Sequence, residues 1–405
     1  MGKKSILFVD DEPNILSGLR RMLRPMRRKW ELTFANSGAE ALEKLEKQTF
    51  DAVVTDIRMP GMDGLTLLQE VEKRSPGTIR FALSGHYERD VFLRSIGPAH
   101  QFLAKPCKAE QLKQTLSTAL ALQSLVCSKD VQTALGELRP LPEPPERVRV
   151  VSGSKDIDCA PDGRAVLAPK FLASLALGAS DVRIIASILP ETAQPDTATT
   201  DTAMELISQF NADTQAALLM LLTVLNMAGD GVCGVSRSTL LTHAFAMART
   251  AEAIAKTERL GSAAVSEAFM AGLLHDVGRI MTAARFPDKY EAVLNSVQTV
   301  TELNRHEKNA FGANTAHVSV ALCNHWGFAN PVLEAVGFYR QPADSSVALG
   351  GALTALHIAT ALSESDQRFL ARAKPELDTE YLETAGLSPA RSKWRQVLQG
   401  VKAVH

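Results

Sequence analysis

Four short, mostly apolar runs in the first 105 residues each end in a polar side chain. They are too short for helices and have the continuous apolar character of strands buried on both faces. The runs, with the residues that follow them, are Ile6–Val9 with Asp10, Asp11 and Glu12, Ala52–Thr55 with Asp56, Phe81–Leu83 with Ser84, and Phe102–Ala104 with Lys105. Helical patterns separate or follow them, at 13–25, 38–48, 64–74, 88–96 and 109–124. This alternation predicts a parallel sheet with helices on both faces.

The chain changes character after about residue 120. Four prolines between Leu138 and Glu146 exclude a helix or a central strand and mark a domain boundary. The helix before them, over about 109–135, is expected to continue as a stiff connector. From about 165 onward Ala, Leu and Met recur at spacings of three and four, which predicts an all-helical region. We therefore expect a domain at 1–124, a connector helix and proline-rich linker at 125–164, and an all-helical domain at 165–405.

Composition and charge narrow the classes of function. The 405 residues are enough for two or three domains, and the formal net charge of −1 argues against general nucleic-acid binding. The five cysteines are widely spaced and form no CxxC pair, which favours a reducing cytoplasm over a disulfide framework. We expect no signal peptide at Met1–Ser5, because only a brief apolar run follows them, and the longest apolar run, Ala216–Leu225, is too short to cross a membrane. We expect that run to be a buried helix, and a cytoplasmic protein with no membrane or nucleic-acid partner.

The polar residues at the predicted strand ends suit phosphoryl chemistry. The carboxyl ends of parallel strands meet at one edge of a sheet, so Asp10, Asp11 and Asp56 are expected to lie together. Crowded carboxylates repel one another unless a cation lies among them, and Mg²⁺ prefers hard oxygen ligands. A carboxylate beside such a metal can accept a phosphoryl group whose oxygens an amine holds, and Lys105 is expected to supply the amine. Ser84 offers a hydroxyl to the same oxygens.

Residues 1 to about 120 resemble the receiver domain of two-component response regulators. The acids, the hydroxyl and the lysine described above match the family pattern, and Met59–Gly64 follows the acceptor position as it does in that family. The resemblance implies an α/β, flavodoxin-like fold with a doubly wound, five-stranded parallel sheet, in which Asp56 takes phosphate from a sensor histidine kinase. It also implies that the backbone carbonyl of Arg58 is a Mg²⁺ ligand. Ser84 and the aromatic Phe102 would then change rotamer together upon phosphorylation.

A second set of motifs lies in the helical half. The segment Met270–Arg279 contains the adjacent pair His275 and Asp276, and His243 lies on a predicted neighbouring helix. Together these residues resemble the HD superfamily of phosphohydrolases, whose metal activates water against a phosphoester. The branch attached to receivers includes the HD-GYP phosphodiesterases of cyclic di-GMP. A sister branch, HDOD, is an output domain that generally lacks the full set of metal ligands.

The later residues favour the HDOD branch. The remaining ligand positions of the superfamily fall on or near Thr315, Tyr339, Arg340 and Thr360, none of which is a metal ligand of that family. Arg340 would bring a fixed positive charge to a vacated ligand position, which opposes cation binding. We therefore expect His243, His275 and Asp276 to form a vestigial site without metal, in which Asp276 orients an imidazole. His357 is expected to be a core or surface histidine.

Two hypotheses follow for the whole chain. In the first, which we favour, phosphorylation of Asp56 with Mg²⁺ switches a non-catalytic HDOD-like domain that acts on an unknown downstream protein by direct contact. The chain is then not an enzyme and has no catalytic residue in the helical half. In the second, it is a metal-dependent phosphodiesterase of cyclic di-GMP or another nucleotide. A further alternative has Arg279 gripping a nucleotide phosphate. The cognate kinase, the signal, the direction of control and homodimer formation are left open.

Overall fold

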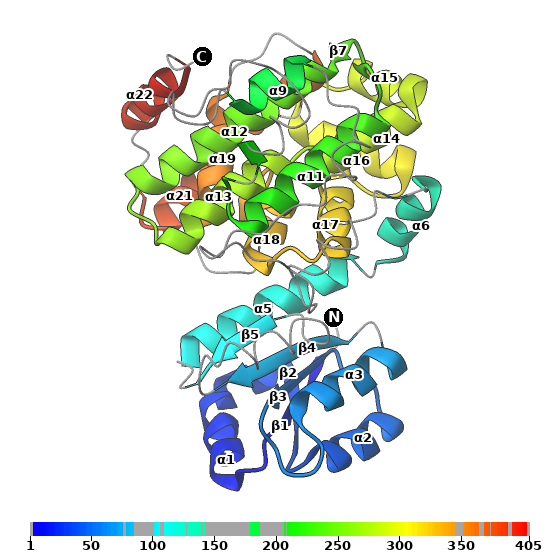
Figure 1. The fold of residues 1–405 in the computed structure, drawn as a ribbon, viewed down its shortest axis with the longest axis vertical. Helices are drawn as coiled ribbons and strands as arrows, with labels where there is room; N and C mark the ends of the chain where they lie inside the picture. Colours follow the sequence, from blue (N-terminus) through cyan, green and yellow to red (C-terminus); the bar gives the residue numbers. More distant parts are fainter. Residues whose placement is uncertain are drawn as a thin grey trace. The chain divides into compact units, whose positions relative to one another are not determined.

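The computed structural model describes most of the chain, in thirteen segments. They are residues 3–75, 78–84, 101–105, 109–126, 128–139, 141, 179–186, 206–207, 209–345, 351–363, 368–372, 374–387 and 391–402. The described residues separate into two units, one ending at α5 and the other beginning at Ser128 (Figure 1). Each unit is described by itself.

The first unit is built on a five-stranded sheet in the order β2-β1-β3-β4-β5, with every neighbouring pair parallel. Its strands are β1 (Lys4–Val9), β2 (Trp30–Ala35), β3 (Ala52–Asp56), β4 (Ile79–Ser84) and β5 (Gln101–Ala104). Its helices are α1 (Pro13–Met22), the 3₁₀ helix η1 (Arg24–Arg28), α2 (Gly38–Lys47), α3 (Gly64–Arg74) and α5 (Ala109–Val126). The predicted doubly wound α/β fold is confirmed. The helix predicted over 88–96 lies outside the described residues.

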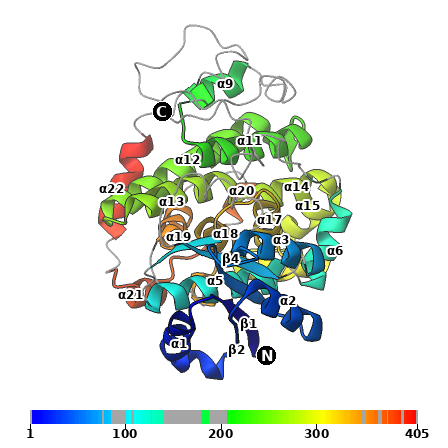
Figure 2. The same ribbon diagram turned by 60° about the horizontal axis from the view of Figure 1, so that its bottom comes forward.

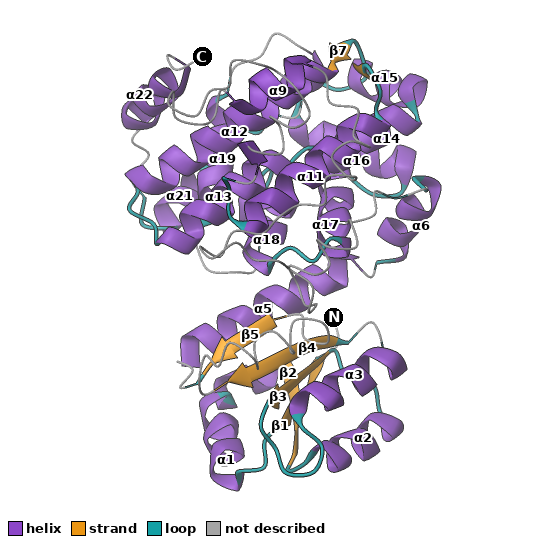
Figure 3. Cartoon of the chain, in the orientation of Figure 1, coloured by secondary structure: helices purple, strands orange, loops and turns teal. Residues whose placement is uncertain are grey.

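Two apolar cores lie on opposite faces of this sheet, with the strands between two layers of helix (Figure 3). Successive side chains of a strand point to opposite faces. Phe8 of β1 therefore packs with α1 and α5, while the adjacent Leu7 and Val9 pack with α2 and α3. Because both faces are covered, the strands carry continuous apolar runs. That is the pattern from which they were predicted.

The first helix is shorter than its sequence pattern predicts. A helix was expected over 13–25, but α1 ends at Met22 and the chain continues as the 3₁₀ helix η1. Pro25 accounts for the difference, because a proline disfavours the α conformation in the residue before it and cannot donate a backbone hydrogen bond.

The second unit is helical among its described residues, apart from a hairpin of two short strands, as the pattern predicted. Its elements are α6 (Lys129–Glu137), α9 (Ala179–Ala186), α11 (Ala212–Met227), β6 (Gly231–Val232), β7 (Val235–Ser236), α12 (Arg237–Thr257), α13 (Ser262–Leu274), α14 (Val277–Arg285), α15 (Pro287–Asn295), α16 (Val300–Phe311), α17 (Thr315–His325), α18 (Asn330–Phe338), η3 (Pro342–Asp344), α19 (Ala352–Leu362), α20 (Arg368–Ala371), α21 (Thr379–Thr384) and α22 (Arg391–Lys402). Within it, α12 and α13 lie side by side (Figure 2). The predicted buried helix is α11, in which residues 217–222 are at most 1% exposed. None of the helices in the described part of the chain is long and apolar enough to cross a membrane.

The connector that the sequence predicted as one helix over about 109–135 is two helices. α5 ends at Val126, and α6 begins at Lys129, after two intervening residues. The Ser128 side chain accepts a hydrogen bond from the backbone N–H of Val131 at 3.2 Å, which is the N-cap geometry that starts a new helix. α6 packs against α17, so it belongs to the second unit. Most of the predicted proline-rich linker lies outside the described residues.

Candidate functional site

The first candidate site lies at the carboxyl ends of β1 and β3. Asp10 and Asp11 follow β1, and Asp56 is the last residue of β3. One carboxylate oxygen from each lies within 4.8 Å of the others. Asp10 is fully buried, and the other two are partly buried. The structure thus brings together the three acids that the sequence placed at one edge of the sheet.

Lys105 bridges two of these acids. Its Nζ atom lies 2.7 Å from Oδ2 of Asp10 and 3.0 Å from Oδ1 of Asp56. Burial raises the pKa of Asp56 above its usual value, although the Lys105 ammonium acts in the opposite direction. Burial would lower the pKa of Lys105, but its hydrogen bonds to the two carboxylates raise it instead. One ammonium does not offset three carboxylates, so the cluster retains negative charge that favours a bound cation.

The loop after Asp56 is held by backbone contacts that require a glycine. Asp63 caps α3 by accepting a hydrogen bond from Thr66 N at 2.7 Å, and Gly64 N donates to Ile57 O at 2.9 Å. A Cβ atom at Gly64 would lie only 1.9 Å from the backbone oxygen of Asp56. Any side chain there would push the acceptor strand out of place. Arg58, the expected backbone ligand, lies in this loop with an exposed side chain.

Two expected switch residues are located only by their backbone. Ser84 ends β4 and pairs in register with Ala104 of β5, and Phe102 lies within β5. Their side chains lie outside the described part of the structure. The coupled rotamer change of Ser84 and Phe102 therefore stays a prediction.

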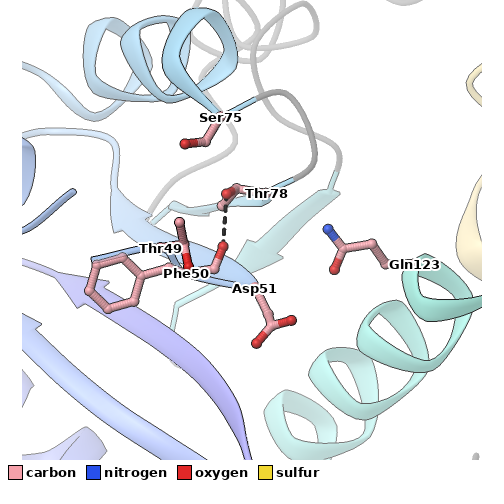
Figure 4. A pocket seen from close by; sticks show the side chains of 6 residues that line it. All are labelled: Thr49, Phe50, Asp51, Ser75, Thr78 and Gln123. Carbon is pink, nitrogen blue, oxygen red and sulfur yellow. Dashed lines mark hydrogen bonds between the residues drawn. The ribbon is translucent and has the colours of Figure 1, made fainter. Parts of the chain in front are cut away.

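A cavity of about 310 Å³ lies at the opposite edge of the same sheet (Figure 4). Its lining residues precede β3 and β4 or belong to α5, and they are Thr49, Phe50, Asp51, Ser75, Thr78 and Gln123. Thr78 Oγ1 donates to Phe50 O at 2.8 Å, and Asp51 accepts from Lys4 Nζ at 2.9 Å. The cavity is therefore separate from the acid cluster, which lies at the carboxyl ends of the strands.

The second candidate site joins α12 to the turn between α13 and α14. Nε2 of His275 lies 3.3 Å from Oδ2 of Asp276, and Nε2 of His243 lies 3.9 Å from the same oxygen. The Nδ1 atom of His275 is 2.8 Å from Gly272 O, an acceptor, so Nδ1 carries a proton and Nε2 faces the carboxylate. Burial, helped by the neighbouring His275, lowers the pKa of His243 to about 3. His243 is therefore neutral at pH 7.

An arginine pairs with Asp276 inside this second site. Arg279 Nε donates to Oδ1 at 3.1 Å and Nη2 donates to Oδ2 at 2.7 Å, in a two-pronged ion pair. The Arg279 side chain is 1% exposed, its Nη1 donates to Phe369 O, and its guanidinium lies 4.1 Å from the Phe369 ring centroid. Burial alone would raise the pKa of Asp276, but Arg279 and the two imidazoles hold it well below its usual value. The donors of Arg279 are thus directed at protein atoms, which argues against the alternative of a phosphate-gripping arginine.

The residues at the vacated ligand positions gather beside this pair, with one exception. Tyr339 donates its hydroxyl to Asp276 Oδ1 at 3.3 Å, and its ring meets the His275 ring edge-on at 5.4 Å. Arg340 donates to the Tyr339 hydroxyl at 3.1 Å and to Thr315 Oγ1 at 3.2 Å. The exception is Thr360, whose hydroxyl donates to a backbone carbonyl of its own helix at 2.9 Å.

Glu307 connects these residues, and sequence reasoning missed it. It is 0% exposed, and its carboxylate accepts hydrogen bonds from Tyr290, Arg340 and Thr315 at 2.5–3.0 Å. In the sequence it stands in a charged run that looks solvated. A signal did exist, because Glu307 lies four residues after Leu303 and four before Phe311, on the buried stripe of α16.

The remaining histidine that could have been a ligand serves the fold. His357 is fully buried; its Nδ1 is 2.8 Å from Tyr339 O, and its Nε2 accepts from Asp378 N at 2.9 Å. Both ring nitrogens are therefore occupied by backbone groups. His357 was expected to be a core or a surface histidine, and the structure places it in the core.

Comparison with known proteins identifies both halves. Residues 6–117 match the response regulator receiver domain, and residues 211–342 match the HDOD domain. The chain therefore combines a receiver domain with an HDOD domain. It is 34% identical over 117 residues to the transcriptional regulatory protein ZraR of Klebsiella oxytoca, covering 29% of this chain and 26% of ZraR. It is 39% identical over 127 residues to the sensor kinase CckA of Brucella abortus, covering 30% of this chain and 13% of CckA.

These similarities are confined to part of each protein. The chain spans about a quarter of the length of the first curated relatives that it matches. Among solved structures, the receiver domain of an HD domain-containing protein from Pseudomonas fluorescens is 30% identical, with a TM-score of 0.29, covering 30% of this chain and 90% of that one.

Proposed function

We propose that this chain is a phosphorylation-controlled response regulator in which Asp56 accepts phosphate from a sensor histidine kinase. The observation that carries the proposal is the cluster of three carboxylates bridged by Lys105 at the strand ends of a receiver domain. The relatives that support it are two-component regulators and a sensor kinase. We expect the chain to work in the cytoplasm, where such kinases phosphorylate their partners.

The residues present fit a Mg²⁺ ion. Hard oxygen ligands come from Asp10, Asp11 and Asp56, and their negative charge exceeds the positive charge of Lys105. The backbone carbonyl of Arg58 would be the remaining ligand that the protein supplies. Bound there, Mg²⁺ would neutralise charge that develops during phosphoryl transfer. An Asp56 oxygen attacks the phosphorus atom, and the bond from phosphorus to the kinase imidazole nitrogen breaks. Lys105 Nζ, 3.0 Å from Asp56, is placed to hold the transferred oxygens, and Ser84 is the second candidate for that role.

The helical half is proposed to be a non-catalytic HDOD output that acts through protein contacts. The support is the buried ion pair between Arg279 and Asp276, in which a guanidinium engages both oxygens of the acid that a metal would need. Arg340 adds a second buried positive charge near the same place. Arg340 is itself paired with Glu307, so the opposition to a divalent cation comes chiefly from Arg279, which already engages the Asp276 carboxylate. No metal is therefore expected in this half.

A metal-dependent phosphodiesterase is the second candidate. It is favoured by the convergence of one ligand atom from each of His243, His275 and Asp276 within 4.8 Å. Three such ligands hold catalytic zinc in some enzymes. Metal analysis of the purified protein, with assays of cyclic di-GMP turnover in Mn²⁺ or Fe²⁺, separates the candidates. Stoichiometric metal that is lost in His275→Ala, together with turnover, would establish the phosphodiesterase.

The receiver proposal is tested by labelling with acetyl phosphate and Mg²⁺. Wild type should gain an acid-stable, base-labile phosphoryl group, and Asp56→Asn should gain none. Asp51→Asn is the matched control, because Asp51 is a partly buried acid at the opposite edge of the sheet that pairs with Lys4. Label on Asp56→Asn equal to that on wild type would refute the assignment of the acceptor.

A further inference from the structure

α6 is an amphipathic helix whose apolar face is entirely covered. Four residues at spacings of three and four, Val131, Ala134, Leu135 and Leu138, are 2–9% exposed, and they face α17 and its surroundings. The residues between them, including Thr133, are exposed. α6 is therefore docked by burial of its apolar stripe, while the residues on its other face are exposed.

Both ends of α6 also lie close to neighbouring segments of the second unit. A Cβ atom at Gly312, in the loop before α17, would lie 3.5 Å from the backbone oxygen of Asp130 in the first turn of α6. At the other end, Arg285 of α14 donates to the backbone oxygen of Glu137 at 3.4 Å. α6 thus packs against α17, lies near the loop before α17, and accepts a hydrogen bond from the last residue of α14.

The helices that hold α6 also carry the buried polar network. Thr315 begins α17 and accepts from Arg340, and Ser319, one turn later, accepts from Gly278 N at 2.9 Å. Gly278 lies in the first turn of α14, where a Cβ atom would be 2.4 Å from Ser319 N. The backbones of α14 and α17 therefore meet directly beside Arg279. Because the two backbones are in direct contact, a shift of α17 relative to α14 would change this contact.

We propose that α6 is the element that transmits the state of the receiver to the HDOD domain, by holding or releasing α17. Only two residues separate α6 from α5, the last helix of the receiver. A change at α5 that pulls on this short link acts first on α6, and then on α17 and the Arg279–Asp276 pair. This inference rests on the proposed function, because it assumes that phosphorylation of Asp56 alters the receiver.

The test is hydrogen exchange of the full chain with and without acetyl phosphate and Mg²⁺. In wild type, phosphorylation should change exchange in the amides of α6 and α17 by about tenfold. Val131→Asp places a charge on the docked face at a position where Asp suits a helix start. It should speed α17 exchange in the resting state and abolish the response to phosphorylation. Thr133→Asp, with the same charge on the exposed face, should behave as wild type.

A second variant separates docking from transmission. Inserting Gly-Ser-Gly-Ser between residues 127 and 128 leaves the docked face intact but slackens the link to α5. Resting exchange of α17 should then match wild type, while the response to phosphorylation should be lost although Asp56 is still labelled. The insertion also decides the matter if Val131→Asp fails to fold.

The outcomes distinguish this inference from the proposed function. A full α17 response in the insertion variant, or in folded Val131→Asp, would overturn the role of α6. That role is also overturned if phosphorylation of wild type alters other helices of the second unit but neither α6 nor α17. If phosphorylation alters nothing outside the receiver, the proposed function fails and not merely the inference.

Discussion

The two halves of this chain each bury a cluster of acidic and metal-ligating side chains, but they balance its charge differently. In the receiver, three carboxylates share one ammonium, and Lys105 remains 22% exposed. In the helical half, one carboxylate is paired with a two-pronged guanidinium that is 1% exposed. The first cluster is left short of positive charge and open to solvent. In the second cluster the positive charge is supplied by the side chain of Arg279.

The difference shows how a site can keep the residues of a metal centre and lose the need for a metal. An arginine in contact with the acid supplies the positive charge that burial demands, and it cannot be removed by dilution or chelation. A lysine that bridges two acids of three leaves room for a mobile ion. Another carboxyl group, that of Glu334 on α18, has no ion pair with a described residue. Its pKa is raised to about 7 by burial, with Glu267 adding to the effect.

The largest effect on stability is expected from removing the guanidinium of Arg279. Arg279→Ala should lower the free energy of unfolding by about 3–5 kcal/mol, because it leaves the Asp276 carboxylate buried without its partner. The lowered pKa of Asp276 means that the stability it contributes is present above its usual pKa of 3.8 and is lost as the pH falls below it. Chemical denaturation at pH 7 measures the loss. Arg305→Ala, an exposed arginine on α16, is the control and should change little.

The same variant also tests whether the guanidinium replaces a metal. If it does, Zn²⁺ or Mn²⁺ should raise the melting temperature of Arg279→Ala but not that of wild type. Equal metal effects on both proteins would contradict the comparison between the two sites.

The next effect is expected from the buried carboxyl group of Glu334. The usual pKa of a glutamate is 4.5, and that of Glu334 in the folded protein is about 7. Between these two pH values Glu334 is protonated in the folded protein and ionised in the unfolded chain. Stability therefore falls as the pH rises through this window. Glu334→Gln should be more stable than wild type at pH 8, by up to about 3 kcal/mol, and should lose this advantage near pH 4. Denaturation curves at the two pH values measure it, and an advantage that is equal at both would contradict the assignment.

A smaller effect is expected from removing the receiver's ammonium. Lys105→Met should bind Mg²⁺ about five- to tenfold more tightly than wild type, because a positive charge close to the ion has been removed. Isothermal titration calorimetry measures the affinity. Lys73→Met, at a lysine that is 71% exposed and pairs with Glu70 on α3, serves as the control. Unchanged Mg²⁺ binding in Lys105→Met would place the ion away from these acids.

The smallest effect is expected on resting stability. Burial raises the pKa of Asp56, so ionising this carboxyl group costs more free energy in the folded protein than in the unfolded chain. Asp56→Asn should therefore raise the melting temperature by about 2 °C without Mg²⁺. Asp51→Asn should lower it, because Asp51 accepts hydrogen bonds from Lys4 Nζ and Ser5 N. Melting curves decide, and a lower transition for Asp56→Asn would contradict the prediction.

Much of the receiver could be predicted because its signals are local. Continuous apolar runs identify the strands, and an acid after a strand is carried to the carboxyl edge of a parallel sheet whatever the loops do. Asp10, Asp11, Asp56 and Lys105 meet for that reason. The end of α1 was misplaced because Pro25 acts on the residues before it. The connector was predicted as one helix because the Ser128 cap was overlooked.

The sequence by itself determined which residue types each half contains and which strand or helix carries them, since periodicity and spacing are properties of the chain. It could not decide what those residues face. Arg279 could have gripped a ligand until its Nη1 atom met Phe369 O, which is 90 residues away in the sequence. Glu307 could have been solvated until Tyr290 and Arg340 packed against it. The reason is that the cost of a buried charge depends on which partner lies within a few ångströms of it, and that distance is set only by tertiary packing.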